Sequence, residues 1–505
     1  MRESDGHEVV IGLDLGTTDI KAIVFDTGGQ PVAHAVRPSD MTYGADGAAE
    51  LDPEQVANAA EDALTEAVAG ARRQGRAVRR IGISAAMHSL IPIGVDGAPL
   101  APAMTWADLR PQPDAEALWR SPAGPEVYSR TGTPVHAMSP LAKLLWLRRA
   151  QPDRFQRAVM FAGLKEWLWR RWFGEWAVDA SLASATGLYN LRAGQWDDGA
   201  LALAGVTASR LPRIVPTTYA RADLASGVAQ RLGLDAGTLI ATGASDGALA
   251  NLGVGALDGR QLVMTIGTSL AARRGVTEPV TDPATRVFCY VLGAGYFVAG
   301  AASNTGGATL DWMYHNLLAR WSGVAAPDGL SHALEEASHA SADGLLFLPY
   351  IAGERAPLWS GETRGALVGL RAEHTAADAL RASVEGMLFN AVWLAGQAVD
   401  GAATPDAIIA TGGVFKSPWI AQLAADILGL PLILAGDVDA STRGAALLAD
   451  IAAGVHSWDK AGAVAAAWLT DAPRIKPNQE ETARYQTKYR HFRALTAALA
   501  EERAL

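Results

Sequence analysis

Two segments of the sequence share a strand, turn, strand pattern, and this repeat constrains the fold more than any other feature. In residues 9–26 apolar runs flank Gly16-Thr17-Thr18, and in residues 261–272 they flank Gly267-Thr268-Ser269, about 250 positions later. Such a repeat predicts a duplicated architecture of two α/β domains, each contributing a phosphate-facing turn to one cleft. Chance is the alternative, because short Gly-Thr-Ser/Thr tripeptides are common.

Predicted elements around the first hairpin extend the α/β pattern. A third strand is expected after Thr27-Gly28-Gly29. Alanine-rich spacing of helical period follows Asp52-Pro53, which is a helix start signal, and predicts a helix over residues 53–73. Residues 81–84 and 90–95 are predicted strands.

A domain boundary is predicted where a strand over residues 238–241 is followed by a helix over residues 248–252. This divides the chain into an N-terminal domain, residues 1–243, and a C-terminal domain, residues 244–505. The charged tail, residues 473–505, has helical spacing and is expected to form peripheral helices.

Composition excludes several classes of protein. The chain has 505 residues, 49% of them apolar and 19% charged, which argues against a single small module and against disorder. A net charge of −10 argues against a nucleic-acid or acidic-membrane partner. Cys289 is the single cysteine, so no internal disulfide is possible. Charges at Arg2, Glu3 and Asp5 are unlike a secretory signal, and a cytoplasmic location is expected.

Residues 287–310 carry no formal charge and are long enough to cross a bilayer. Five glycines interrupt this stretch. Residues 288–292 and 296–299 are therefore predicted as two short strands around a Gly-Ala-Gly turn, and no membrane span is expected.

Glycine-bearing turns are the sequence features best suited to bind a polyphosphate. The chain lacks the G-x-x-x-x-G-K-[ST] and H-E-x-x-H motifs. It has instead turns at residues 14–18, 266–269, 304–307 and 411–413. Glycine lets the backbone N–H groups approach an anion, and threonine hydroxyls add further donors.

These turns and several other segments together resemble the FGGY carbohydrate kinases. The similar segments, in order from about Val10 to Ala449, are Asp14-Leu15-Gly16-Thr17-Thr18 with Lys21, Ser84-Ala85-Ala86-Met87-His88, Thr105-Trp106-Ala107-Asp108, residues 138–147, Gly243-Ala244-Ser245-Asp246-Gly247, Ile266-Gly267-Thr268-Ser269, residues 365–370 and Thr411-Gly412-Gly413. Ala150 departs from the polar residue that usually closes the first family signature.

The resemblance implies an α/β fold of two actin-like (ribonuclease H-like) domains around an interdomain cleft. It places the sugar largely on the N-terminal FGGY domain, residues 1–243, and ATP largely on the C-terminal nucleotide-binding FGGY domain, residues 244–505. ATP and Mg²⁺ are the implied cofactors, and a small sugar or sugar acid is the implied partner. The sequence leaves the oligomeric state open, a homodimer included.

Within the family, the segments at residues 87–89, 105–108, 165–167 and 183–188 are most similar to gluconate kinases. The expected reaction is phosphorylation of gluconate to 6-phosphogluconate. A xylulose or other pentulose kinase is the near alternative. A switch of the actin-like ATPase type without a sugar substrate is the alternative from another class.

The resemblance assigns roles to two acidic residues. Asp246 matches the catalytic aspartate and is expected to act as general base. The alternative is a purely structural role, in which Asp246 caps the following helix. Asp14 is the candidate Mg²⁺ ligand, and its alternative is a turn-stabilising aspartate.

The remaining expected site residues fall into two groups. Those expected to bind the nucleotide are Gly16, Thr17, Thr18, Lys21, Gly267, Thr268, Gly306, Gly307, Gly412 and Gly413. Those expected on the sugar side, besides Asp246, are Met87, His88, Trp106, Asp108 and Lys165. Lys165 is the candidate partner for a substrate carboxylate, because a buried unpaired charge is costly. Gly353-Glu354-Arg355-Ala356-Pro357 resembles a family loop and is assigned a structural role.

Overall fold

The computed structural model describes residues 8–318, 329–399, 401–436 and 439–501. The charged residues behind the expectation of no secretory signal, Arg2, Glu3 and Asp5, lie outside these ranges. The chain forms two compact units, Met1–Asp258 with Gly275–Ala299 and Val438–Thr470, and Gly259–Arg274 with Gly300–Asp437 and Asp471–Leu505. The division at residue 243 that the sequence suggests stays a prediction.

The first unit contains most of the strands. These are β1 (Glu8–Leu15), β2 (Asp19–Phe25), β3 (Pro31–Pro38), β4 (Thr42–Tyr43), β5 (Ala49–Leu51), β6 (Ala77–Ala85), β7 (Ile91–Ile93), β8 (Ala103–Met104), β9 (Met160–Ala162), β10 (Ala177–Asp179), β11 (Tyr189–Asn190), β12 (Gln195–Trp196), β13 (Arg213–Val215), β14 (Ala220–Arg221), β15 (Leu239–Ser245) and β18 (Phe288–Gly293).

Its helices are α1 (Pro53–Arg73), α2 (Gln112–Arg120), α3 (Ala123–Thr131), α4 (Pro140–Ala150), α5 (Pro152–Arg157), α6 (Leu164–Phe173), α7 (Ala180–Ser184), α8 (Asp198–Ala204), the 3₁₀ helix η1 (Ala208–Arg210), α9 (Ser226–Leu232), α10 (Asp246–Gly253), α16 (Ala440–Ala452) and α17 (Trp458–Ala467).

A mixed sheet of order β14-β15-β6-β1-β2-β3 forms the centre of the first unit. β1 pairs antiparallel with β2, and β6 is parallel to both β1 and β15. Val9 and Ile11 belong to the core cluster beneath α1, whereas Val10 packs with Ala446 of α16. Since neighbouring strand residues point to opposite faces, α1 and α16 cover opposite faces of this sheet.

Helix α1 forms where the sequence predicts it. Asp52 is its N-cap and accepts a hydrogen bond from Glu54 N, and Pro53 occupies the first turn. The alanine and leucine residues along one side are buried against β2 and β3. The third predicted strand is also confirmed, as β3 antiparallel to β2.

The second unit contains β16 (Gln261–Ile266), β17 (Leu270–Val276), β19 (Tyr296–Ser303), β20 (Leu346–Leu348), β21 (Ala366–Val368), β22 (Ala407–Thr411), β23 (Leu432–Leu434) and β24 (Arg474–Ile475), with helices α11 (Gly307–Met313), α13 (Gly329–His339), α14 (Ala376–Ala398), α15 (Pro418–Leu428) and α18 (Gln479–Glu501), the π-helix η2 (Tyr314–Leu318) and the 3₁₀ helix η3 (Gly413–Lys416). β17 and β19 each extend past the limits of this unit.

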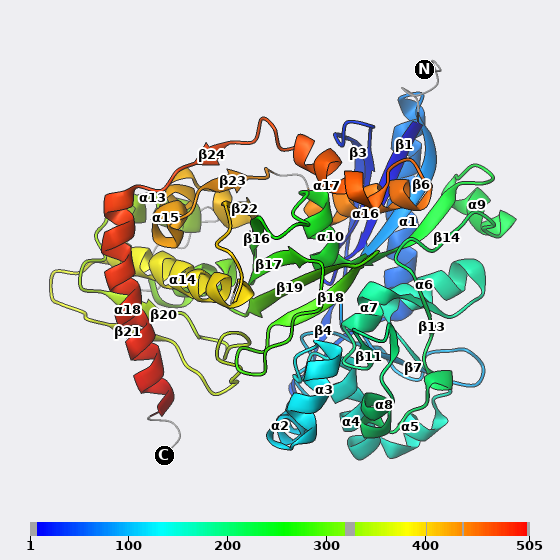
Figure 1. The fold of residues 1–505 in the computed structure, drawn as a ribbon, viewed down its shortest axis with the longest axis horizontal. Coiled ribbons are helices and arrows are strands. Elements are labelled where there is room, and N and C mark those ends of the chain that lie inside the picture. The colour runs from blue at the N-terminus through cyan, green and yellow to red at the C-terminus, as the bar shows by residue number, and fades with distance from the viewer. Residues whose placement is uncertain (1–7, 319–328, 400, 437–438, 502–505) are drawn as a thin grey trace. The chain divides into compact units, whose positions relative to one another are not determined.

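In the second unit β16 lies between β17, which is antiparallel to it, and β22, which is parallel to it. The described part of the tail forms β24 and one long helix, α18, drawn red in Figure 1. Tyr485 and Phe492 of α18 are buried in the core of this unit. The tail therefore contributes to the core as well as to the surface.

The uncharged stretch at residues 287–310 forms β18, β19 and the start of α11, so the two predicted strands are confirmed. Among the described residues, no helix combines the length and the hydropathy that crossing a bilayer requires.

Candidate active site

The carboxyl ends of three neighbouring strands bring Asp14 and Asp246 to one edge of the first sheet. In the parallel ladders Asp14 lies opposite Ser84 of β6, and Ser84 lies opposite Ala244 of β15. Ser84 Oγ donates to Asp14 Oδ1 at 2.5 Å. Asp246 follows Ala244 by two residues, and its negative charge helps to raise the pKa of Asp14.

The backbone at the end of β15 sets the position of Asp246. Gly243 has φ of +72°, and a Cβ atom there would lie 1.8 Å from Ile83 O, so the bulge in this strand requires glycine. Ser245 is the N-cap of α10, and its Oγ accepts from Ala248 N at 3.4 Å. Because Ser245 has the capping role, Asp246 is not needed for it; Asp246 Oδ1 accepts from Gly247 N at 2.7 Å.

Asp14 is a buried carboxyl group in an acidic setting. Burial, then the charges of Asp439 and Asp246, raise its pKa to about 7, while the Ser84 hydrogen bond and Lys21 oppose the rise. A cation beside Asp14 would offset these like charges. The described residues include no group of three or more His, Cys, Asp or Glu side chains able to hold a metal. Mg²⁺ does not need one, since it is usually held by one or two carboxylates with phosphate oxygens and water.

Lys21 and Asp439 form an ion pair beside Asp14. Lys21 lies opposite Asp14 in the β1–β2 ladder, and its Nζ is 3.0 Å from Asp439 Oδ2. Burial acts to raise the pKa of Asp439, but Lys21 and hydrogen bonds outweigh it and lower that pKa. Asp439 also caps α16 by accepting from Thr442 N. Sequence reasoning missed Asp439, although an aspartate directly before an alanine-rich helical segment is a capping signal.

The Gly16-Thr17-Thr18 turn contacts one of the predicted sugar-side residues. Trp106 Nε1 donates to Thr17 Oγ1 at 3.2 Å. Thr18 is exposed at the same turn, and its carbonyl accepts from Ser39 N. The structure thus brings together a residue expected to bind phosphate and one expected to bind the sugar.

His88 is held on both sides by other parts of the first unit. Its φ is +73°, and its Nδ1 lies 2.8 Å from Ala185 O. Its carbonyl accepts from the ammonium group of Lys143, a side chain that is fully buried. Burial lowers the pKa of Lys143 to about 7, with the charge of Arg110 acting in the same direction and Asp108 acting against it. Met87, next to His88, packs partly against the core.

Two predicted sugar-side charges already have partners within the protein. The Asp108 carboxylate is fully buried and accepts from the backbone N and Nε of Arg110 at 3.1 and 3.0 Å. Lys165 Nζ lies 2.6 Å from Asp179 Oδ2 and donates to Ala244 O at 3.2 Å. Contact of either residue with a substrate stays a prediction.

Glu166, next to Lys165, is another buried acid of the first unit. Its Oε2 accepts from Gly163 N at 2.6 Å, and its Oε1 has no hydrogen-bond partner among the described residues. Burial and the charge of Asp179 raise the pKa of Glu166 to about 7. Trp169 and Trp172 of the same helix are buried in the core.

In the second unit, the predicted nucleotide-side glycines gather at the ends of β16 and β22. Gly307 N donates to Gly267 O at 2.7 Å, and a Cβ atom on Gly306 would lie 2.6 Å from Thr268 O. Gly412 has φ of +101° and packs against Ile266 O, with Gly413 following it at the start of η3. Thr268 is exposed at this turn. Gly306 is buried and serves close packing, whereas the backbone of Gly267, Gly307, Gly412 and Gly413 is at least partly exposed and available to a ligand.

Glu354 holds the loop that precedes Gly306. It is buried, and its two oxygens accept from Ser303 Oγ, Asn304 N and Thr305 Oγ1 at 2.7–2.9 Å. Burial nevertheless raises its pKa. The structural role expected for the segment at residues 353–357 agrees with these contacts.

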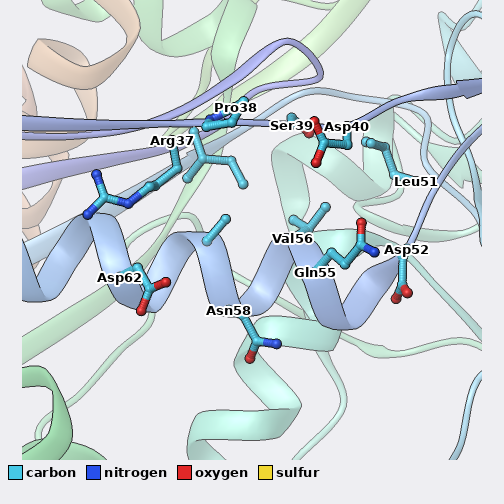
Figure 2. Close-up of a pocket in the computed structure, with 12 residues that line it drawn as sticks. Arg37, Pro38, Ser39, Asp40, Leu51, Asp52, Gln55, Val56, Asn58 and Asp62 are labelled. Carbon is cyan, nitrogen blue, oxygen red and sulfur yellow. The ribbon is translucent and has the colours of Figure 1, made fainter.

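A cavity of about 310 Å³ between β3 and α1 lies apart from the predicted site residues (Figure 2). Figure 2 shows Asp52, Asn58 and Asp62 along α1, with Arg37 and Asp40 on the neighbouring segment. Arg37 pairs with Glu66 at 2.6 Å, and Asp52 caps α1. Arg37 and Asp52 therefore already have structural partners, and the cavity contains none of the residues predicted for the site.

Comparisons with known proteins agree with this arrangement. Residues 9–253 match the N-terminal domain, and residues 262–453 the C-terminal domain, of the FGGY family of carbohydrate kinases. The chain is 36% identical to a gluconokinase of Bacillus subtilis over 89% of both proteins. Among solved structures it resembles a xylulose kinase and a gluconate kinase of Lactobacillus acidophilus, with TM-scores of 0.91 and 0.90, 31% identity and 98% coverage of each chain.

The two family models lie in the chain order that the repeated hairpins predict, one on each side of residues 254–261. The α/β fold of two domains is therefore confirmed. The chain belongs to the FGGY family of carbohydrate kinases.

Proposed function

We propose that this carbohydrate kinase is a gluconokinase that transfers the γ-phosphoryl group of ATP to the terminal hydroxyl of gluconate. The observation that carries the choice of substrate is the 36% identity to a gluconokinase over 89% of both chains. The products are 6-phosphogluconate and ADP. ATP is the phosphoryl donor of this family. A cytoplasmic location follows from the supply of ATP.

We assign Asp246 as the general base. Its carboxylate accepts the hydroxyl proton while the sugar oxygen bonds to the γ-phosphorus and the bond from that phosphorus to the leaving ADP oxygen breaks. Its place at the first turn of α10, after a bulged strand, supports this role, since the capping function belongs to Ser245.

We assign Asp14 as the Mg²⁺ ligand. The like charges of Asp439 and Asp246 around it favour a bound cation. Bound Mg²⁺ would neutralise charge on the transferring phosphates. Lys21 and the hydroxyls of Thr17 and Thr18 would donate to phosphate oxygens from the adjoining turn, as would Gly16 N–H.

In the second unit, we propose that Gly267 and Thr268 bind phosphates and that Gly306, Gly307, Gly412 and Gly413 line the adenosine. Their gathering at the ends of β16 and β22 supports this assignment. A fixed set of backbone donors costs little reorganisation when the nucleotide binds.

On the sugar side, we propose Met87, His88, Trp106 and Asp108 as the walls of the pocket, with Lys165 facing the gluconate carboxylate. Lys165→Met should raise the KM for gluconate about tenfold and leave the KM for a neutral pentulose unchanged. An unchanged KM for gluconate, with a lower kcat, would instead assign Lys165 to holding Ala244 and Asp246 in place.

The substrate is tested by measuring ADP release with gluconate, xylulose, ribulose, glycerol and glucose. We expect kcat/KM for gluconate to exceed that for the other compounds at least tenfold. A preference for xylulose would support the second candidate, which the likeness to a solved xylulose kinase favours. Slow ATP hydrolysis that no sugar changes would contradict both and indicate an actin-like ATPase switch.

A further inference from the structure

A cavity of about 350 Å³ in the first unit contains none of the residues assigned above. It lies against α16 and the segment that follows it, which Figure 1 draws in orange, and against β1, β2 and β6. Residues that matter for its chemistry are Phe25, Arg80, Arg443, Asp450, His456 and Trp468. Its volume is within the range of small-molecule pockets.

Arg443 is the unusual group in this cavity. The residue is only 4% exposed, and its Nε has no hydrogen-bond partner among the described residues. The Arg443 guanidinium carbon lies 5.5 Å from the centre of the Trp468 ring, over which it stacks. Burial lowers its pKa to about 10, which still leaves the group charged at neutral pH. A buried charge without a counter-charge is costly, so an anion at this place would stabilise the protein.

The other charges around the cavity already have partners. Arg80 Nε pairs with Asp450 Oδ1 at 2.5 Å, and Arg80 Nη1 lies 3.4 Å from Glu8 Oε2. Asp26 Oδ1 accepts from Gly28 N and Gln30 N, each at 2.9 Å. Glu8, Asp26 and Asp450 are thus engaged by groups other than Arg443, and no carboxylate among the described residues is paired with Arg443. In the cavity of Figure 2, by contrast, the arginine is paired with Glu66.

Apolar and aromatic surface adjoins this charge. Phe25 and Val10 line the cavity together with the partly buried Trp468 ring. A ligand that fits these surfaces has an oxyanion at one end and an apolar or planar body.

We propose that this cavity is a second ligand site, which binds a small organic anion through a phosphate or carboxylate paired with Arg443 and a body packed on Trp468. The site is separate from the residues assigned to the sugar and to the nucleotide, and it does not depend on which sugar is phosphorylated.

Isothermal titration calorimetry of the full chain with phenyl phosphate tests the site. Saturating ADP is present to fill the nucleotide site. Benzoate and inorganic phosphate are titrated in parallel to separate carboxylate from phosphate and to measure the contribution of the ring. We expect the wild type to bind one phenyl phosphate, and Arg443→Met to weaken this binding at least tenfold.

Arg493→Met is the matched control. Arg493 stacks over Trp393 at 3.5 Å in the second unit, but its side chain is exposed. This variant should bind phenyl phosphate as the wild type does. Absence of binding to the wild type at 20 mM probe, or equal affinity in Arg443→Met, would overturn the proposal.

Trp468→Leu provides an independent variant in case Arg443→Met does not fold. It should weaken binding of phenyl phosphate about fivefold and leave inorganic phosphate unchanged, because only the ring contact is lost. Equal losses for both probes, or none for phenyl phosphate, would contradict the proposed orientation. Arg443→Met itself should have a melting temperature at least equal to that of the wild type, since it removes an unpaired buried charge.

Discussion

The two hairpins that recur in the sequence occupy equivalent places in the two sheets. In the first unit β1 pairs antiparallel with β2 and parallel with β6, and Asp14 lies opposite Ser84. In the second unit β16 pairs antiparallel with β17 and parallel with β22, and Thr265 lies opposite Thr411. Each pair is joined by a side-chain hydrogen bond, at 2.5 Å for Asp14 and 2.9 Å for Thr265.

The two hairpins, which are the two copies of the repeat, differ in the charge of the residues beside their turns. Next to the first turn, Asp14 lies opposite Lys21, with Asp439 and Asp246 near enough to affect its pKa. Next to the second turn, the corresponding pair is Thr265 and Ala271, and Thr265 accepts from Arg273 Nη1. The two hairpins therefore share a scaffold but differ in the side chains beside their turns. The charged copy suits a metal ion and a proton transfer, and the copy with hydroxyl and backbone groups suits binding of phosphate.

The largest effect that this comparison predicts comes from Asp246. Asp246→Asn should lower kcat about 10²-fold or more with small changes in the KM values, because the amide cannot accept the proton. Steady-state kinetics with gluconate and ATP measure it. A kcat within a few-fold of wild type would show that Asp246 is not the base. The charged copy would then not carry the proton transfer.

Asp14 and Thr265 allow a direct test of the difference between the copies. Asp14→Asn keeps an oxygen to accept from Ser84 but loses the negative charge, so kcat/KM should fall about 30-fold and the Mg²⁺ concentration for half-maximal rate should rise. Thr265→Val, its counterpart in the second hairpin, should change kcat/KM less than about threefold. Similar losses in the two variants, or an unchanged Mg²⁺ requirement in Asp14→Asn, would show that the difference in charge is not functional.

The sequence predicted much of the fold because the signals were local. The two hairpins, α1 with its Asp52 cap and the strands of residues 287–310 each depend on neighbouring residues alone. The end of β15 was placed too early, since Gly243 allows the strand to continue through a bulge to Ser245.

Contacts between distant segments could not be predicted in this way. Asp439 meets Lys21 across 418 positions, and Lys143 meets the His88 carbonyl from a helix with an ordinary apolar pattern. The partner of Lys165, Asp179, could not be predicted either, because residue type and spacing do not report which charges the fold has already paired.

A smaller predicted effect is the pH dependence of the unfolding free energy that the buried acid Glu166 causes. Its pKa is about 7 in the folded protein and near 4.5 when unfolded, so the folded state binds the proton more tightly. Its contribution to stability is fully present below pH 4.5 and is lost as pH rises through 7. Between pH 5 and 8 the unfolding free energy of the wild type should fall by about 2–3 kcal/mol relative to Glu166→Gln.

Urea unfolding of both proteins at pH 5 and pH 8 measures this difference. Glu354→Gln, in the second unit, is the comparison variant, because burial raises the pKa of Glu354 as well, against several hydrogen bonds that favour the charged form; its effect should have the same direction. A pH dependence of Glu166→Gln equal to that of the wild type would contradict the assignment of a shared burial effect to Glu166.

The smallest effect should come from the contact between Trp106 and Thr17, which belongs to the charged copy but carries no charge itself. Trp106→Phe keeps an aromatic face and removes the Nε1 donor, which lies 3.2 Å from Thr17 Oγ1. A neutral hydrogen bond contributes about 1 kcal/mol, so the KM for gluconate or ATP should rise about threefold to fivefold while kcat stays within about twofold.

Trp167→Phe is the matched control for Trp106→Phe, because the Trp167 Nε1 has no hydrogen-bond partner among the described residues. It should leave both KM values unchanged. If Trp167→Phe raised KM as much as Trp106→Phe, the effect would come from altered packing rather than from the lost donor. If Trp106→Phe changed kcat but neither KM, the contact with Thr17 would act on the reacting groups, and the first turn would do more than bind phosphate.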